Sequence, residues 1–101
     1  MNTHHAYIYN HPMTDHARRR MYSRGISPAA IRSALRYGRI IHVRGVKIYA
    51  IGRREVDRYM PHGVDLSRFE GVQVVCTPHE VVRTVYRNRD FRGLRPRHRR
   101  H

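Results

Sequence analysis

A histidine and two arginines recur at every fourth position near the start of this chain. His16, Arg20 and Arg24 share one face if residues 15–24 form a helix. The ordinary pKa of a histidine lies near neutral pH, so this side chain can transfer protons, and guanidinium groups neutralise phosphate charge. The spacing therefore predicts a site that binds and cleaves a phosphodiester, while a plain solvated helix face is the alternative.

The helix that would carry these side chains has clear boundaries in the sequence. Thr14 is a good N-cap residue, and Gly25 suits the left-handed position just past a helix C-terminus. Ser27-Pro28 then provides a second N-cap followed by proline at the first helical position. We expect one short helix over residues 15–24 and a second that ends at Gly38.

The hydrophobic period changes after the second helix. Residues 39–52 are rich in β-branched side chains on both sides of Arg44-Gly45, which predicts a hairpin. A helical turn is expected at residues 55–60, and two further strands at 72–76 and 80–87. Helices followed by strands favour an α+β fold, here two short helices and then an antiparallel sheet of about four strands.

The chain is long enough for one domain with a modest core. Residues 1–13 are interpreted as an extended lead-in or short edge segment, and residues 14–88 as the α+β domain. Residues 89–101 contain six arginines and almost no apolar side chains, so we expect a disordered basic tail.

The charge of the chain is strongly unbalanced. It has 21 Lys and Arg against 7 Asp and Glu, a formal net charge of +14, and Lys47 is its only lysine. Such a surface favours a polyanionic partner, which we expect to be RNA or another nucleic acid. Arginine suits this role because its planar guanidinium binds phosphate bidentately.

Other classes of protein and site have little support in the sequence. The single cysteine, Cys76, forms no internal disulfide, and we see neither a signal peptide nor a membrane span, so we expect a cytoplasmic protein with no membrane association. His4, His5 and His11 could join His16 at a metal, but no cysteine or carboxylate spacing supports this. We expect neither a metal nor a cofactor.

Three segments together resemble a known family. They are TDHARRRMYSRGIS at 14–27, ALRYGR at 34–39 and RTVYRN at 83–88. This combination resembles the domain-of-unknown-function 4258 family, small bacterial proteins allied to RelE-type and BrnT-type toxins. The resemblance implies helices followed by an antiparallel sheet, as in the barnase, colicin and RelE group of metal-independent ribonucleases. Residues 53–71 are longer than the family pattern requires, and the basic tail lies outside it.

The resemblance adds a second half to the site. The family's helix histidine falls on His16, and its closing-strand threonine falls on Thr84. A hydroxyl there could bond a phosphate oxygen, and Tyr86 could do the same or stack on a base. Strand alternation places Thr84 and Tyr86 on the face of Val82, and Arg83 on the opposite face. The expected catalytic residues are His16, Arg20, Arg24 and Thr84, and the expected RNA contacts are Arg18, Arg19, Tyr86 and Arg87.

These observations leave three hypotheses about function. The first is a metal-independent endoribonuclease of toxin type, in which His16 and the arginines act on RNA. The second is a nucleic-acid-binding module without enzymatic activity, in which His16 has no chemical role. The third is an interaction domain for an acidic antitoxin or immunity protein, because a free chain this basic calls for a compensating partner.

Overall fold

The computed structural model describes residues 6–8 and 11–94. The helices are α1 (Asp15–Ser23), α2 (Pro28–Tyr37) and α3 (Arg53–Tyr59), and the strands are β1 (Ala6–Ile8), β2 (His11–Met13), β3 (Arg39–Val43), β4 (Val46–Ala50), β5 (Val72–Cys76) and β6 (Val82–Arg87).

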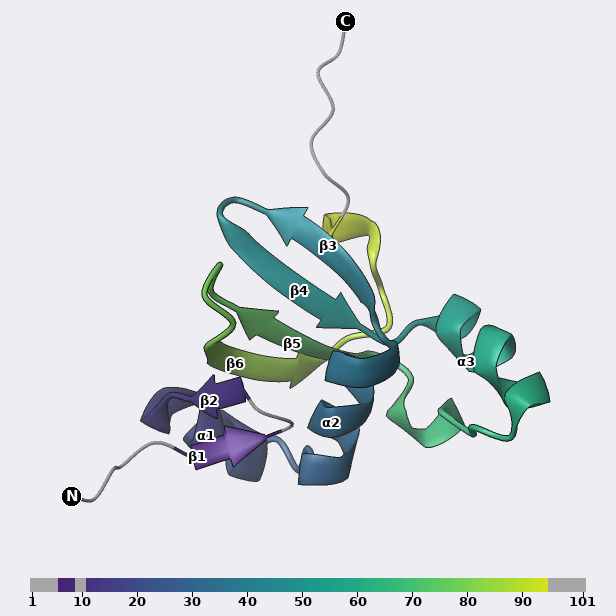
Figure 1. The fold of residues 1–101 in the computed structure, drawn as a ribbon, viewed down its shortest axis with the longest axis horizontal. Coiled ribbons are helices and arrows are strands. Elements are labelled where there is room, and N and C mark those ends of the chain that lie inside the picture. Colours follow the sequence, from purple (N-terminus) through teal and green to yellow (C-terminus); the bar gives the residue numbers. More distant parts are fainter. Residues whose placement is uncertain (1–5, 9–10, 95–101) are drawn as a thin grey trace, which may run out of the picture.

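The strands form one sheet in the order β1-β2-β6-β5-β4-β3 (Figure 1). All neighbours are antiparallel except β2 and β6, which run parallel through the pair Met13 and Val82. The α+β class is confirmed. The expectation of about four strands, all antiparallel, is wrong in detail, because residues 6–8 and 11–13 form the further strands β1 and β2, and β2 joins the sheet in parallel.

The boundaries of α1 follow the capping residues. The Thr14 hydroxyl accepts a hydrogen bond from the Ala17 amide at 3.0 Å. At the other end, Gly25 has a φ of +63°, and the Ile26 amide donates to the Met21 carbonyl at 2.9 Å. This is the Schellman arrangement, in which a left-handed residue reverses the chain and satisfies the last carbonyls. Both predicted ends of the helix are confirmed.

The next two elements also obey local rules. The Ser27 hydroxyl accepts from the Ala30 amide at 3.1 Å, and α2 ends with Gly38 as its C-cap, as expected. Between β3 and β4, Arg44 and Gly45 have φ values of 50° and 78°. Two successive positive φ angles give the type I′ turn that matches the twist of a two-residue hairpin. The predicted hairpin is confirmed.

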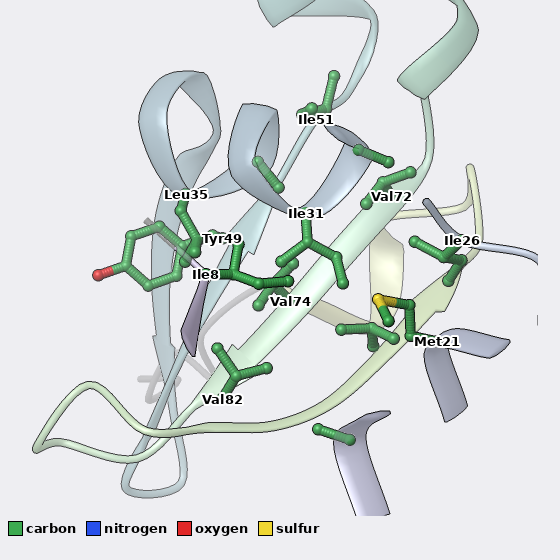
Figure 2. Close-up of a cluster of buried hydrophobic side chains, with 14 of the residues drawn as sticks. Ile8, Met21, Ile26, Ile31, Leu35, Tyr49, Ile51, Val72, Val74 and Val82 are labelled. Atoms are coloured by element: carbon green, nitrogen blue, oxygen red, sulfur yellow. The ribbon is translucent and has the colours of Figure 1, made fainter. Parts of the chain in front are cut away.

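The main core lies between one face of the sheet and the two helices α1 and α2. Figure 2 shows Ile31 of α2 beside Val74 of β5, within a cluster that also holds Met21 of α1. Val72, Val74, Val82 and Val85 are fully buried in it. The β-branched strand residues and the small residues of α2 allow the helix to approach the sheet closely.

A second, smaller cluster lies on the other face of the sheet. It contains Ile48 and Ala50 of β4 together with Leu94, and Phe91 packs against it. The expected disordered tail at residues 89–101 is therefore wrong for its first part, since Phe91 and Leu94 supply the apolar surface that anchors residues 89–94. Residues 95–101 lie outside the described residues. No described helix has the length and apolar character needed to cross a membrane.

A buried carboxylate connects the start of α3 to β3. Glu55 accepts hydrogen bonds from the Arg39 guanidinium at 3.0–3.2 Å and from the Gly52 amide at 2.8 Å. The Arg39 guanidinium also lies over the ring of Phe91, 5.0 Å from its centroid. The helix begins at Arg53, two residues before the expected helical turn, because Glu55 reaches back to Gly52 as in a capping box.

We expect Glu55→Ala to lower the free energy of unfolding by about 3 kcal/mol, because it leaves a partly buried guanidinium and a backbone amide without their acceptor. Urea denaturation monitored by circular dichroism measures this loss. Asp57→Ala is the matched control, since its ion pair with Arg53 is exposed, and it should cost less than about 1 kcal/mol. Equal losses for the two variants would contradict the role assigned to Glu55.

The single cysteine is fully buried in the main core. Burial raises the pKa of the Cys76 thiol from 9.0 to about 11, and the charge of Lys47 on the neighbouring strand opposes this rise. A buried thiol with a raised pKa is a poor nucleophile, so Cys76 serves as a small core residue.

The Cys76 thiol makes stability depend on alkaline pH. Above pH 9 the unfolded chain loses this proton while the folded chain keeps it until about pH 11, so the free energy of unfolding falls as pH rises through this window. The expected fall is about 2–3 kcal/mol. Urea denaturation between pH 8 and 11 under reducing conditions measures it, and Cys76→Ala should show a correspondingly shallower dependence.

Candidate functional site

The first helix and the last strand are joined at both ends of their contact. The Thr14 amide donates a hydrogen bond to the Val82 carbonyl at 3.0 Å, just before α1 begins. At the far end, the Arg24 guanidinium donates to the Val85 carbonyl at 2.9 Å. These two bonds fix α1 alongside β6, and we call the surface along this contact the α1–β6 seam. Of the four expected catalytic residues, His16, Arg24 and Thr84 lie on it, whereas Arg20 lines neither of its hollows and contacts His16.

The first hollow on the seam brings the two expected halves of the site together. Its volume is about 380 Å³, and it is lined by Thr14, His16, Val75, Arg83 and Thr84. His16 comes from the first turn of α1 and Thr84 from the middle of β6, 68 positions later in the chain. The predicted proximity of His16 and Thr84 is therefore present in the structure, and their chemical roles stay predictions.

A β-bulge in β6 decides which side chains enter this hollow. Thr84 pairs with Val75, but the next pair joins Cys76 to Val82, which leaves Arg83 as an extra residue on β6. Val82 and Val85 both point into the core, while Thr84 lies on the other face. The expectation that Thr84 and Tyr86 share the face of Val82 is wrong, because the bulge interrupts the alternation.

The same bulge gives Arg83 a place in the site. The expectation that its side chain projects away from Thr84, as simple alternation requires, is wrong. Instead, Arg83 is exposed and lines the first hollow together with His16 and Thr84. The sequence has no local signal for the bulge, such as a glycine in β6.

The second hollow lies further along the seam, at the C-terminal end of β6. It is an open depression of about 640 Å³, lined by Arg24, Tyr86, Arg87 and Asn88. Partial burial raises the pKa of the Tyr86 phenol above its ordinary value, and the nearby Arg24 guanidinium opposes that rise. Asn88 was missing from the sequence-based site, although it is the last residue of the RTVYRN segment.

The remaining arginines of α1 differ in their surroundings. The Arg20 Nε donates a hydrogen bond to His16 Nε2 at 3.3 Å on the exposed face of the helix. Arg18 forms an ion pair with Asp15 at 3.2 Å, so its charge is partly compensated. Arg19 is exposed, and neither it nor Arg18 lines a described hollow.

The distribution of carboxylates leaves the seam strongly cationic. All seven acidic residues of the chain are among the described residues, and none of them lines either hollow. Most form ion pairs elsewhere, such as Glu55 with Arg39 and Asp90 with Arg92. Arg24, Arg83 and Arg87 therefore have no carboxylate partner, and a bound anion is the natural complement of their charge.

The histidines do not gather into a metal site in the described part of the chain. No three His, Cys, Asp or Glu side chains there are arranged to hold an ion. His11, in β2, forms a hydrogen bond with Glu80 at 2.9 Å. β2 lies near the opposite edge of the sheet from β3. His4 and His5 lie outside the described residues.

The family of the chain follows from a comparison with known families. The profile of a domain of unknown function, DUF4258, matches residues 13–87. The chain belongs to the DUF4258 family. This confirms the resemblance seen in the sequence, and the match spans both α1 and β6, hence almost all residues of the two hollows. No curated protein and no solved structure matches the chain.

The second hollow yields a test of the geometry of this DUF4258 domain. Removing the guanidinium in Arg24→Ala should raise the pKa of Tyr86 further, because the positive charge that favours the phenolate is lost. A pH titration followed by NMR of ring-labelled tyrosine measures the shift. Arg19→Ala should leave this titration unchanged, and an identical effect from both variants would contradict the contact between Arg24 and Tyr86.

Proposed function

We propose that this domain binds RNA along the α1–β6 seam and cleaves it as a metal-independent endoribonuclease of the RelE-like toxin type. The observation that carries the proposal is the first hollow, where His16 and Thr84 meet from distant parts of the chain. A proton-transfer group, a hydroxyl and the Arg83 guanidinium at one small surface are the parts that cleavage of a phosphodiester requires.

Each group in the first hollow has a role in this proposal. RNA cleavage through the 2′-hydroxyl needs a base at that oxygen, stabilisation of the charged phosphorane and a proton for the leaving 5′-oxygen. His16 takes the first proton at Nε2 and returns it to the leaving group, which requires the exposed Arg20 side chain to turn from that nitrogen to the phosphate. Arg83 and Arg20 stabilise the phosphorane charge, and the Thr84 hydroxyl donates to a phosphate oxygen.

The second hollow extends the binding surface in one direction. A strand of RNA whose scissile phosphate lies at His16 would place a neighbouring nucleotide near Arg24 and Arg87. Their guanidiniums can bind the next phosphate, and the half-buried ring of Tyr86 offers a stacking surface for an unpaired base. We therefore propose single-stranded RNA as the substrate class.

A specific observation favours a second candidate, a nucleic-acid-binding module without catalysis. His16 is the only histidine or carboxylate that lines the first hollow, and its ring is exposed to solvent. An exposed histidine without a second acid-base partner is a weak catalyst, whereas the arginines of the seam bind phosphates without its help. The two candidates share the binding surface and differ in the role of His16.

We expect the purified full-length protein to cleave single-stranded RNA, and His16→Ala to lower the cleavage rate by about 100-fold, the usual contribution of one general acid-base group. A labelled oligoribonucleotide incubated with EDTA and resolved by electrophoresis measures the rate. His62→Ala is the matched control, because His62 is exposed in the turn after α3, away from the seam, and its rate should equal that of the wild type.

Binding measured in parallel separates the two candidates. If RNA binds with strong salt dependence but remains intact, or if His16→Ala cleaves as fast as the wild type, the binding module is correct and the enzyme is not. If Arg24→Ala and Arg87→Ala bind as tightly as the wild type, the seam is not the RNA surface. Arg53→Ala is the control for a paired arginine, since its side chain contacts Asp57 and Glu70.

A further inference from the structure

The sheet ends at β3, whose outer edge pairs with no strand among the described residues (Figure 1). The type I′ turn after Val43 and the register Val43–Val46 place Val43, Ile41 and Arg39 in the hydrogen-bonded pairs with β4. The intervening residues, Ile40 and His42, therefore direct their backbone N–H and C=O groups away from β4. Two complete sets of backbone donors and acceptors line the open edge.

This edge lacks the features that usually prevent strand addition. Natural edge strands are protected by charged side chains, lysine above all, by proline, by bulges or by very short length. β3 has five residues, contains neither proline nor lysine, and pairs with β4 without a bulge. Its one arginine, Arg39, is held by Glu55 and lies over the ring of Phe91. The Ile40 side chain is 50% exposed, and His42 beside it is exposed as well. An apolar side chain at an unprotected edge favours pairing with another extended segment.

The charge around the edge indicates the kind of segment that fits. Residues 16–54, which cover α2, β3, β4 and all of α1 after its first residue, contain no Asp or Glu. The carboxylates that contact β3 and β4 from elsewhere, Glu55 and Glu80, are paired with Arg39 and Lys47. The exposed Arg36 and Arg44 lie just before and just after β3 in the chain. Two copies of a chain with a net charge of +14 repel each other, so pairing with an acidic segment is favoured over pairing with a second copy.

We propose that the outer edge of β3 is a docking site for an acidic polypeptide partner, which adds an extended strand to the sheet. The strand pairs with the backbone groups of Ile40 and His42, an apolar side chain of the partner covers Ile40, and its carboxylates lie near Arg36 and Arg44. This surface is separate from the α1–β6 seam, so the proposal holds whether or not the domain acts on RNA.

The first experiment uses synthetic peptides and the full-length protein. The probe is a fluorescent eight-residue peptide of alternating Glu and Val, and its binding is followed by anisotropy. Two isomers carry N-methyl groups on alternate residues, which removes the amide protons on one edge of the strand or on the other. We expect one isomer to bind as the parent does and the other to lose at least about tenfold in affinity. Equal affinities of the parent and both isomers would overturn strand addition.

The second experiment changes the protein at a single amide. Proline is tolerated at an edge position whose N–H faces solvent, so His42→Pro removes one outward donor without disturbing the pairs to β4. We expect it to weaken peptide binding by about tenfold. His42→Thr, which lacks the imidazole but keeps the amide, should bind like the wild type. A melting temperature close to that of the wild type verifies that His42→Pro is folded. If this variant does not fold, the N-methyl isomers alone test strand addition.

Two further results identify the occupant. A peptide with Gln in place of every Glu should bind at least about tenfold more weakly, because it cannot pair with Arg36 and Arg44. Equal binding of the Gln and Glu peptides would overturn the acidic partner. A wild-type protein that is dimeric in sedimentation, with His42→Pro monomeric, would also overturn it, since the edge would then pair with a second copy. His16→Ala should not change peptide binding, which separates this site from the proposed RNA surface.

Discussion

The hydrogen bond from the Thr14 amide to the Val82 carbonyl determines where the chemistry of this domain can occur. It joins the start of α1 to the start of β6, and Thr14 also caps α1 through its hydroxyl. One residue thus sets both the start of the helix and its position on the sheet. His16 is placed two residues later, within reach of Thr84, and both hollows follow the line from this bond to the bond between Arg24 and Val85.

The carboxylates of this chain are used to stabilise the fold, and their placement creates the cationic surface. Glu55 holds Arg39 and the start of α3, while Glu80 accepts from Tyr49 at 2.7 Å and contacts Lys47 and His11. With seven acidic side chains against 21 basic ones, none lines either hollow of the α1–β6 seam, and Asp15 at the start of α1 is paired with Arg18. The uncompensated arginines are therefore a consequence of where the acids are needed, and their repulsion is relieved when an anion binds.

Local rules were enough to predict the helices and the hairpin, because each is set by adjacent residues: Thr14 and Gly25 for α1, Ser27-Pro28 for α2, and Arg44-Gly45 for the turn. The strand order of the sheet was harder to predict, since β2 joins β6 through a single pair between residues far apart in sequence. The bulge at Arg83 was also missed. The bulge arises from the register of β6 on β5, and no residue type in β6 indicates it. It is the reason that Arg83 and Thr84 line the same hollow as His16. Leu94 was assigned to a tail because its burial depends on a surface made by β4.

The two proposed surfaces lie at different positions in one sheet, and their separation limits how a partner could affect RNA binding. β6 and β3 are separated by β5 and β4, so three strand spacings of about 4.8 Å, or roughly 14 Å, lie between them. A strand added at β3 would not cover the α1–β6 seam, and its charge would act there through more than one Debye length at physiological salt, which is about 8 Å. An acidic partner that blocks RNA must therefore extend beyond the added strand and reach Arg24 and Arg87 with further carboxylates, whereas a partner limited to β3 would leave the seam open.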